Sequence, residues 1–453
     1  MLIALIVVLF VVGSARNLRT FRTPIVSPQS KPNQTLKLPL LDPSKYSKDI
    51  YRGRNTKSSS EKKSGKQIQP EVPLEQMEGF KAYNLMQNNQ KVGKVTLGRS
   101  GNPPPPVYDS YVRENATFFS LVRNSDFQGI LSSIDSVEER FNKVYHYDWV
   151  FANDEPFTPA FIEHVTARVS GSAHFVHIPA QFWGYPPWID LDKAERARKN
   201  MKENKIKYGA SQSYRHMCRF NSGFFFHLPV MKNYKYYWRV EPDIAFKCDL
   251  FDTDWFRFMR INKKKYAFVL APLELHMTVK NLWRSTKMFF SENPDLLHPD
   301  NSFSFLSDDN GDNYNMCHFW SNFELGDMDF FRSSAYTKFF EYLDQVGGFY
   351  YSRWGDAPVH TLAVTTLLSK DEVHYIPDTG YFHNPNGNCP RDDAIRRARR
   401  CSCSTRFEHT WSRGSCIPKW YEVNELEKPS YGIKFKNVHK FAENEDADEY
   451  DDW

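Results

Sequence analysis

The chain has 453 residues, enough for one large enzyme or for about three average domains. Aromatic residues make up 16% of it and hydrophobic residues 41%, which excludes a wholly disordered or fibrous chain. The formal net charge of +5 gives no reason to expect a nucleic-acid partner. Beyond the N-terminus no apolar run is long enough to cross a bilayer, which excludes a multi-pass membrane protein.

The first 15 residues are predicted to be a targeting segment. Residues 1–12 are almost entirely apolar, and the small residues Gly13 and Ala15 follow. This pattern fits a cleaved signal peptide or an uncleaved membrane anchor, and the lack of a basic residue before the run suggests an incomplete start. Either form places the rest of the chain in a secretory lumen, where the sequons at Asn33 and Asn115 can be glycosylated.

Three further segments are predicted from composition. Residues 16–107 are rich in Lys, Ser, Pro, Asn and Gln and lack a sustained apolar period, which is typical of a disordered stalk or linker. Residues 108–440 carry the periodic apolar pattern of a folded domain. Residues 441–453 form a strongly acidic tail.

Strand and helix patterns alternate along the folded region. Together they predict an α/β fold with a mostly parallel central sheet covered by helices on both faces. The strands are expected at 116–122, 145–151, 173–178, 236–240 and 266–271, and the helices at 130–141, 159–168, 190–205, 213–226 and 253–261.

Two acidic residues flank a proline directly after the strand expected at 236–240, in the sequence Glu241-Pro242-Asp243. Ligands of open parallel sheets bind at the carboxyl ends of the strands, and the proline fixes the backbone between the two carboxylates. Such a pair can hold a divalent cation that neutralises a diphosphate. The residues alone fit a proline turn capped by carboxylates equally well.

Acidic residues also lie among aromatic residues around Glu324 and Asp356. This combination is typical of sugar sites, where rings pack on the sugar and acids bind its hydroxyls. The alternative is a core aromatic cluster with helix-capping acids. A turn-rich loop at 380–388 presents His383, which is either a ligand or an ordinary surface histidine.

Four of the seven cysteines lie within residues 389–416. An oxidising lumen favours disulfides over a zinc site, whose usual two-residue spacing is absent from Cys401 and Cys403. The connectivity stays open, and the odd number requires a free thiol or an intermolecular bond.

Five aromatic-rich strings resemble the fungal KRE2/MNT1 family of α-1,2-mannosyltransferases, glycosyltransferase family 15. The resemblance extends from about residue 116 to about residue 421, nearly the whole folded region. The strings read YDWVFANDEPF from Tyr147, SYRHMCRF from Ser213, YWRVEPDI from Tyr237, HFWSNFE from His318 and RWGDAPVH from Arg353.

The resemblance implies a GT-A-like fold for nucleotide-diphosphosugar transfer, GDP-mannose as donor, Mn²⁺ as cofactor and retention of the anomeric configuration. It further implies a type II protein of the Golgi membrane, anchored through the N-terminal segment with its catalytic domain in the lumen. The implied acceptor is a mannosylated glycoprotein with O-linked or N-linked chains.

The resemblance also implies residue roles at the donor site. Glu241 and His383 are expected to bind Mn²⁺, with Asp243 as the second acid of the strand-end motif. Tyr214 is expected near the metal and the diphosphate. Arg239 is expected to stabilise the charge that builds on GDP as the mannosyl bond breaks.

Glu324 matches the candidate nucleophile of the family, and Asp356 matches an acid near the acceptor. Retention requires either a covalent glycosyl intermediate on a carboxylate or same-face attack assisted by the leaving diphosphate, and the sequence leaves both open. Two other functions fit the same residues. One is mannosylphosphate transfer from GDP-mannose, and the other is a mannan-binding lectin without turnover.

Overall fold

The computed structural model describes residues 95–98 and 112–429, all of which belong to one unit of the chain. The predicted targeting segment at 1–15, the acidic tail at 441–453 and most of the stalk lie outside the described residues. Within these two ranges, no helix has both the length and the apolar character needed to cross a membrane.

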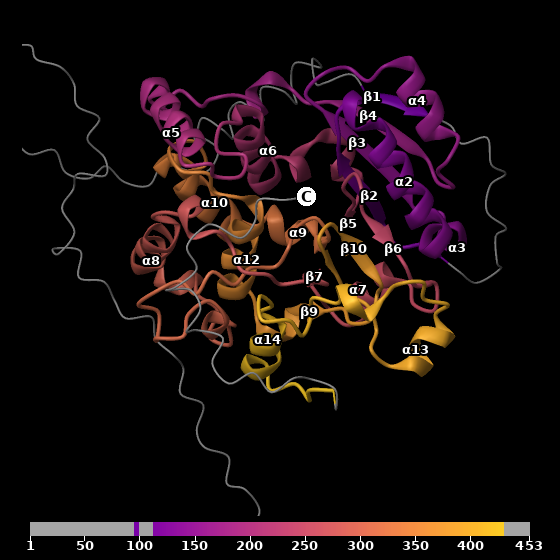
Figure 1. Cartoon of the computed structure of the whole chain (residues 1–453). Helices are drawn as coiled ribbons and strands as arrows, with labels where there is room; N and C mark the ends of the chain where they lie inside the picture. Colours follow the sequence, from indigo (N-terminus) through magenta and orange to yellow (C-terminus); the bar gives the residue numbers. More distant parts are fainter. Residues whose placement is uncertain (1–94, 99–111, 430–453) are drawn as a thin grey trace, which may run out of the picture. The chain divides into compact units, whose positions relative to one another are not determined.

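An eight-stranded mixed sheet forms the centre of the unit, in the order β1-β4-β3-β2-β5-β8-β7-β9 (Figure 1). Strands β4, β3, β2 and β5 are parallel neighbours, whereas β1 and β8 run antiparallel to the strands beside them. The predicted α/β class with a mostly parallel central sheet is confirmed. The strands are β1 (Val95–Gly98), β2 (Ala116–Leu121), β3 (Asp148–Asn153), β4 (Ala173–His177), β5 (Tyr236–Arg239), β7 (Tyr266–Phe268), β8 (Leu325–Asp327) and β9 (Val373–Tyr375).

A small antiparallel sheet in the order β11-β10-β6 adjoins the segment that follows β5. It consists of β6 (Ala245–Phe246), β10 (Tyr381–His383) and β11 (Asn386–Gly387). Because β6 begins two residues after Asp243, its pairing with β10 brings the loop of His383 toward the carboxyl end of β5.

Helices cover both faces of the large sheet, because successive strand residues point to opposite sides. Phe118 of β2 belongs to the core beneath α2, α4 and α7, whereas the adjacent Phe119 belongs to the core beneath α6, α10 and α12. Figure 1 shows α2 and α4 on one side of the sheet and α6, α10 and α12 on the other. The helices are α2 (Phe127–Val137), α3 (Lys143–Tyr145), α4 (Pro159–Thr166), α5 (Leu191–Glu203), α6 (Gln212–Gly223), α7 (Trp255–Ile261), α8 (Leu282–Glu292), α9 (Met328–Phe331), α10 (Ser334–Val346), α11 (Gly348–Tyr351), α12 (Asp356–Leu367), α13 (Asp393–Ala398) and α14 (Ile417–Val423).

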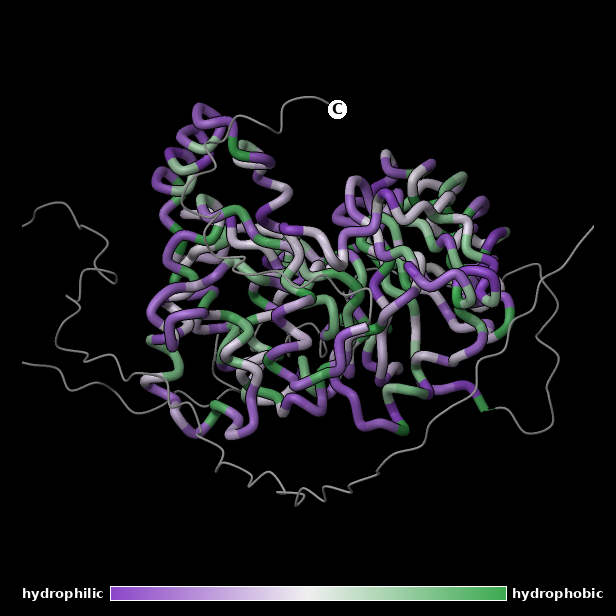
Figure 2. Tube along the Cα trace, turned by 60° about the horizontal axis from the view of Figure 1, so that its bottom comes forward, coloured by the Kyte–Doolittle hydropathy of each residue, from purple (hydrophilic) through white to green (hydrophobic). Residues whose placement is uncertain are grey.

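The helix starts agree with local sequence signals. The side chains of Asp190, Ser211 and Asp254 accept hydrogen bonds from the first-turn amides of α5, α6 and α7. The surface helices are amphipathic, and in Figure 2 hydrophilic and hydrophobic residues alternate along them. In contrast, α12 is buried along its whole length and therefore shows no such alternation.

Strand β1 lies inside the segment predicted as a stalk, so that prediction is wrong for residues 95–98. Four residues of β1 pair with β4 in antiparallel register, from Val95 opposite Val176 to Gly98 opposite Ala173. The strand is too short to give a sustained alternation within a polar segment, and its pairing with β4 forms the edge of the sheet.

Three disulfides are present, as the sequence predicts. They join Cys248 to Cys401, Cys317 to Cys416 and Cys389 to Cys403. The remaining cysteine, Cys218, is a buried thiol on α6. The first two bonds attach the segment 389–416 to residues that follow β6 and precede β8, and the third closes a loop within that segment.

Candidate active site

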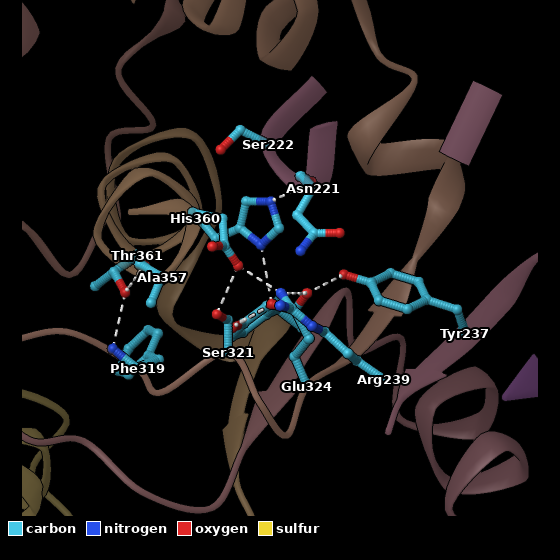
Figure 3. Close-up of polar contacts among 12 residues, drawn as sticks. Asn221, Ser222, Tyr237, Arg239, Phe319, Ser321, Glu324, Ala357, His360 and Thr361 are labelled. Carbon is cyan, nitrogen blue, oxygen red and sulfur yellow. Dashed lines mark hydrogen bonds and ion pairs between the residues drawn. The ribbon is translucent and has the colours of Figure 1, made fainter. Parts of the chain in front are cut away.

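Three carboxylates converge on one arginine at the carboxyl end of β5 (Figure 3 shows Arg239 and Glu324). The Arg239 guanidinium donates from Nη1 to Asp356 Oδ2 and from Nη2 to Glu241 Oε1. Nη1 also lies 3.8 Å from Glu324 Oε1. The Arg239 side chain is only 5% exposed, so these contacts form in a region with little water.

The charges of this cluster are mutually dependent. Burial lowers the pKa of Arg239, but Glu241, Asp356 and Glu324 outweigh burial and raise it well above its usual range. Burial raises the pKa of Asp356, whereas the Arg239 charge and hydrogen bonds from Arg239 and Ser321 lower it to a net value below the usual range. Asp356 is therefore ionised and Arg239 is fully charged.

Asp356 is positioned by the start of α12, of which it is the first residue. Its carboxylate faces the positive end of the helix dipole, and Ser321 Oγ donates to Oδ2 over 2.8 Å. The segment of Ser321 precedes β8, which pairs with β5, so the sheet and α12 together fix the position of Asp356 relative to Arg239.

Glu324 has no exposed surface, and donors from three elements occupy both of its oxygens. Tyr237 of β5 donates to Oε1 over 3.0 Å, and Tyr266 of β7 donates to Oε2 over 2.9 Å. His360 Nδ1 of α12 lies 2.9 Å from Oε2. To attack an anomeric carbon, the carboxylate would have to leave all three partners. This geometry fits a buried anion that organises the site better than it fits the candidate nucleophile implied by the family resemblance.

Glu241 and Asp243 leave the end of β5 in different surroundings. The Glu241 side chain is 29% exposed. Asp243 is exposed, has a left-handed φ of 63° and donates its backbone N–H to Gly129 O over 3.2 Å. Its carboxylate lies so close to Gly129 in the first turn of α2 that an added Cβ there would be 2.7 Å from Oδ1.

His383 approaches the same strand end from β10. Its ring packs edge-on against Trp320 at 5.2 Å between centroids, and its buried Nδ1 makes no hydrogen bond within the described part of the chain. Burial lowers the pKa of His383, while the charges of Glu241 and Asp243 act in the opposite direction. The imidazole is therefore neutral at pH 7, which is the form that binds metals.

The described residues contain no group of three or more His, Cys, Asp or Glu side chains arranged to hold a metal ion. Glu241 and His383 nevertheless supply one carboxylate and one imidazole close enough for the Glu241 charge to act on the ring. Hard divalent cations in nucleotide sites take one or two protein ligands and complete their coordination with phosphate oxygens and water. The donor set fits a cation that binds together with a diphosphate.

Tyr214 lies in the first turn of α6, next to the Arg353 guanidinium, which is 5.1 Å from its ring centroid. The ring stacks on Tyr208 at 4.5 Å. Burial raises the pKa of Tyr214 well above its usual range, and the charge of Asp356 contributes to this rise. Tyr214 is therefore a neutral hydroxyl that is electrostatically coupled to the Arg239 cluster.

The structure thus brings all seven predicted site residues to the region around the end of β5. It adds four residues to which the sequence assigned no role, namely Tyr237, Tyr266, Ser321 and His360. One signal for His360 was available, because Asp356 and His360 are four residues apart and therefore share a helix face. The two tyrosines had no such signal, since a strand tyrosine is usually a core residue.

Comparison with known proteins gives consistent results. The family model described as glycolipid 2-alpha-mannosyltransferase matches residues 72–425. The alpha-1,2 mannosyltransferase KTR1 of Saccharomyces cerevisiae is 50% identical over 340 residues, which cover 75% of this chain and 84% of KTR1. Glycolipid 2-alpha-mannosyltransferase 1 of Candida albicans is 49% identical over 329 residues, which cover 72% and 76% of the two chains.

Two solved structures share the fold. Core-mannan synthase A of Aspergillus fumigatus in its Mn/GDP form has a TM-score of 0.67 and 36% identity, over 73% of this chain and 91% of that one. The mannosyltransferase Ktr4p of S. cerevisiae in complex with GDP has a TM-score of 0.65 and 38% identity, over 73% and 85% of the two chains. The predicted GT-A-like fold and the family resemblance are both confirmed. The chain belongs to the glycolipid 2-alpha-mannosyltransferase family.

Proposed function

We propose that the protein transfers mannose from GDP-mannose to a mannose-terminated O-linked or N-linked glycan, with retention and formation of an α-1,2 linkage. The observation that carries this proposal is the set of charges at the end of β5, where a buried arginine, two ionisable acids and a neutral imidazole surround one strand terminus. Relatives that are named α-1,2-mannosyltransferases are about half identical to this chain, and a related structure contains Mn and GDP.

Mn²⁺ is the proposed cofactor, with Glu241 and His383 as its protein ligands. When bound, it neutralises charge that develops on the diphosphate. Asp243 is proposed as the second acid of the motif, close enough to His383 to affect its protonation. Glu241 also accepts a hydrogen bond from Arg239, so its carboxylate links the metal site to the guanidinium.

The remaining residues are proposed to bind and orient the substrates. Arg239 provides a fixed positive charge for the leaving diphosphate, and Tyr214 provides a neutral hydroxyl beside it. Asp356 is proposed to face the acceptor and to keep its charge through Arg239. Because Glu324 is enclosed by its three partners, we favour same-face transfer over a covalent intermediate on Glu324.

A transfer assay tests this function. GDP-mannose and Mn²⁺ are incubated with mannose, mannobiose and a core N-glycan, and the product linkage is determined. We expect GDP release, an α-1,2-linked product without phosphate, and complete loss of transfer in excess EDTA. A product that contains phosphate would establish mannosylphosphate transfer instead, and glycan binding without GDP release would establish the lectin.

A matched pair of variants tests the metal assignment. Glu241→Gln keeps the size of the side chain and removes its charge, so we expect weaker Mn²⁺-dependent GDP binding. Glu203→Gln removes one carboxylate from the exposed end of α5 and serves as the control. Normal GDP affinity in the Glu241→Gln protein would contradict the proposed metal site.

We also propose that the protein is a type II protein of the Golgi membrane, anchored through residues 1–15. The apolar run of that segment and the family membership support this location. Protease protection in sealed Golgi vesicles, with carbonate extraction, provides the test. Digestion of the catalytic domain in intact vesicles, or its release by carbonate, would contradict the proposal.

A further inference from the structure

The hydrogen bonds of His360 restrict its protonation state. Nε2 lies 3.1 Å from the backbone oxygen of Asn221, and Nδ1 lies 2.9 Å from Glu324 Oε2 (Figure 3). A carbonyl oxygen only accepts, so Nε2 must carry a hydrogen. A proton must then also lie between Nδ1 and Oε2, because two lone pairs at this distance would repel each other.

The surroundings of Glu324 decide which atom holds that proton. Tyr237 and Tyr266 donate to the two carboxylate oxygens, and Arg239 Nη1 lies 3.8 Å from Oε1. A carboxylate that faces two hydroxyl donors and a guanidinium is an acceptor toward all three. The proton therefore belongs on Nδ1, and the pair consists of an imidazolium and a carboxylate, both without exposed surface.

The other groups packed around the pair do not replace this proton. Burial raises the pKa values of Tyr237, Tyr266 and Tyr336 well above their usual range, and that of the Cys218 thiol on α6 is also raised, so all four stay protonated. Phe331 of α9 contacts the ring without a charge. The charged neighbours are Arg239 and Asp356.

We propose that His360 is a positioning residue, which holds one proton against Glu324 and keeps this buried pair electrically neutral beside Arg239. Without that proton, Arg239 would face three uncompensated carboxylates. With the imidazolium, it faces two, Asp356 and Glu241. The consequence for catalysis rests on the proposed function: His360 reduces the negative charge that a bound diphosphate meets.

The pH dependence of stability tests the proton directly. Under this proposal the folded pair holds a proton at neutral pH, whereas an unfolded histidine loses its own near about pH 6.5. The folded chain then binds one proton more than the unfolded chain, so stability falls as pH rises, by about tenfold in the unfolding constant per pH unit. We expect this fall in stability above neutral pH in the wild type. It should be absent from Glu324→Gln, in which a neutral His360 accepts from the amide.

A double-variant cycle tests the charge coupling. His360→Gln leaves Glu324 charged and without its cation, so we expect a melting temperature lower by roughly 10 °C. Glu324→Gln added to it restores neutrality, so the double variant should melt above His360→Gln alone. His216→Gln is the control, because His216 is buried and burial lowers its pKa to about 4, so it carries no charge to lose. The changes in melting temperature caused by His216→Gln and by Glu324→Gln should therefore add in their double variant.

GDP binding in the presence of Mn²⁺ provides the second readout. We expect severalfold weaker binding in His360→Gln and partial recovery in the double variant, whereas a role in shape alone would make the double variant worse than either single one. Equal pH slopes of wild type and Glu324→Gln would overturn the proposal even if His360→Gln failed to fold. Since stability needs no turnover, loss of the proposed function would leave the pH and melting results intact.

Discussion

Arg239 is the residue whose replacement should disturb the site most. Arg239→Met removes the charge shared by Asp356, Glu241 and Glu324 and keeps an apolar side chain of similar length. Removing one partner of a buried ion pair costs about 3–5 kcal/mol, because the other partner stays buried and unpaired. The Asp356 side chain is 6% exposed and fully meets this condition, whereas Glu241, at 29%, recovers some water. We therefore expect Arg239→Met to lower the free energy of unfolding at pH 7 by an amount in the upper half of that range.

The sign of the pH dependence follows from Asp356. Its pKa is lowered in the folded chain, chiefly by Arg239 against the effect of burial. The stability from this pairing is therefore present above about pH 4, the unfolded value, and is lost as the pH falls through the lower folded value. The difference between wild type and Arg239→Met in urea unfolding should shrink as the pH falls below about 4.

A second buried pair supplies the control. Arg219 donates two hydrogen bonds of 2.7 Å to Asp344 and is as buried as Arg239, but it lies outside the cluster. Arg219→Met should lose comparable stability and retain Mn²⁺-dependent GDP binding, whereas Arg239→Met should lose both. Unchanged stability of Arg239→Met at pH 7, or a difference that does not vary with pH, would refute the reasoning.

Two further changes test the fold. A chain that begins at residue 112 lacks β1 and exposes the edge of β4, so we expect it to melt below a chain that begins at residue 72, and equal melting would show that β1 adds nothing. Replacing Cys317 and Cys416 by Ser opens a loop with a sequence separation of 99, and the chain-entropy relation gives a loss of up to about 4.7 kcal/mol. Equal urea midpoints of this variant and the wild type under oxidising conditions would contradict that expectation.

The part of the site that follows a strand could be predicted from the sequence. Glu241 and Asp243 come directly after an apolar strand, so the strand pattern locates them. Asp356 begins α12, which was not among the predicted helices, and its aromatic surroundings alone marked it as a candidate. The resemblance to a known family then supplied roles that spacing alone left open.

The parts that depend on the interior could not be predicted in this way. Tyr237 and Tyr266 meet Glu324 because β5 and β7 both pair with β8, and a strand order is not visible in any local pattern. The enclosure of Glu324 could not be predicted either, because it also requires His360 of α12 to lie against the carboxylate. Strand β1 was missed because its four residues give only two alternations in a polar segment.

Gly129 offers a way to move Asp243 without changing Asp243 itself. An alanine in a helix is usually more favourable than a glycine by about 0.5–1 kcal/mol. At Gly129 its Cβ would lie 2.7 Å from Asp243 Oδ1 and 2.9 Å from Cγ. Because the Asp243 side chain is exposed, the carboxylate can turn into solvent at little cost. The stability of Gly129→Ala should therefore stay within about 1 kcal/mol of the wild type.

Its effect on GDP binding then isolates the position of the Asp243 carboxylate. If Asp243 takes part in the donor site, Gly129→Ala should weaken Mn²⁺-dependent GDP binding about as much as Asp243→Ala, because both remove the carboxylate from its place. The combined variant should bind no more weakly than Asp243→Ala alone, since the alanine at position 129 then has nothing left to displace. Isothermal titration of the three variants, with melting temperatures on the same preparations, measures both quantities. Wild-type affinity in Gly129→Ala together with weak binding in Asp243→Ala would mean that the carboxylate acts from more than one position, and the argument from its contact with α2 would fail.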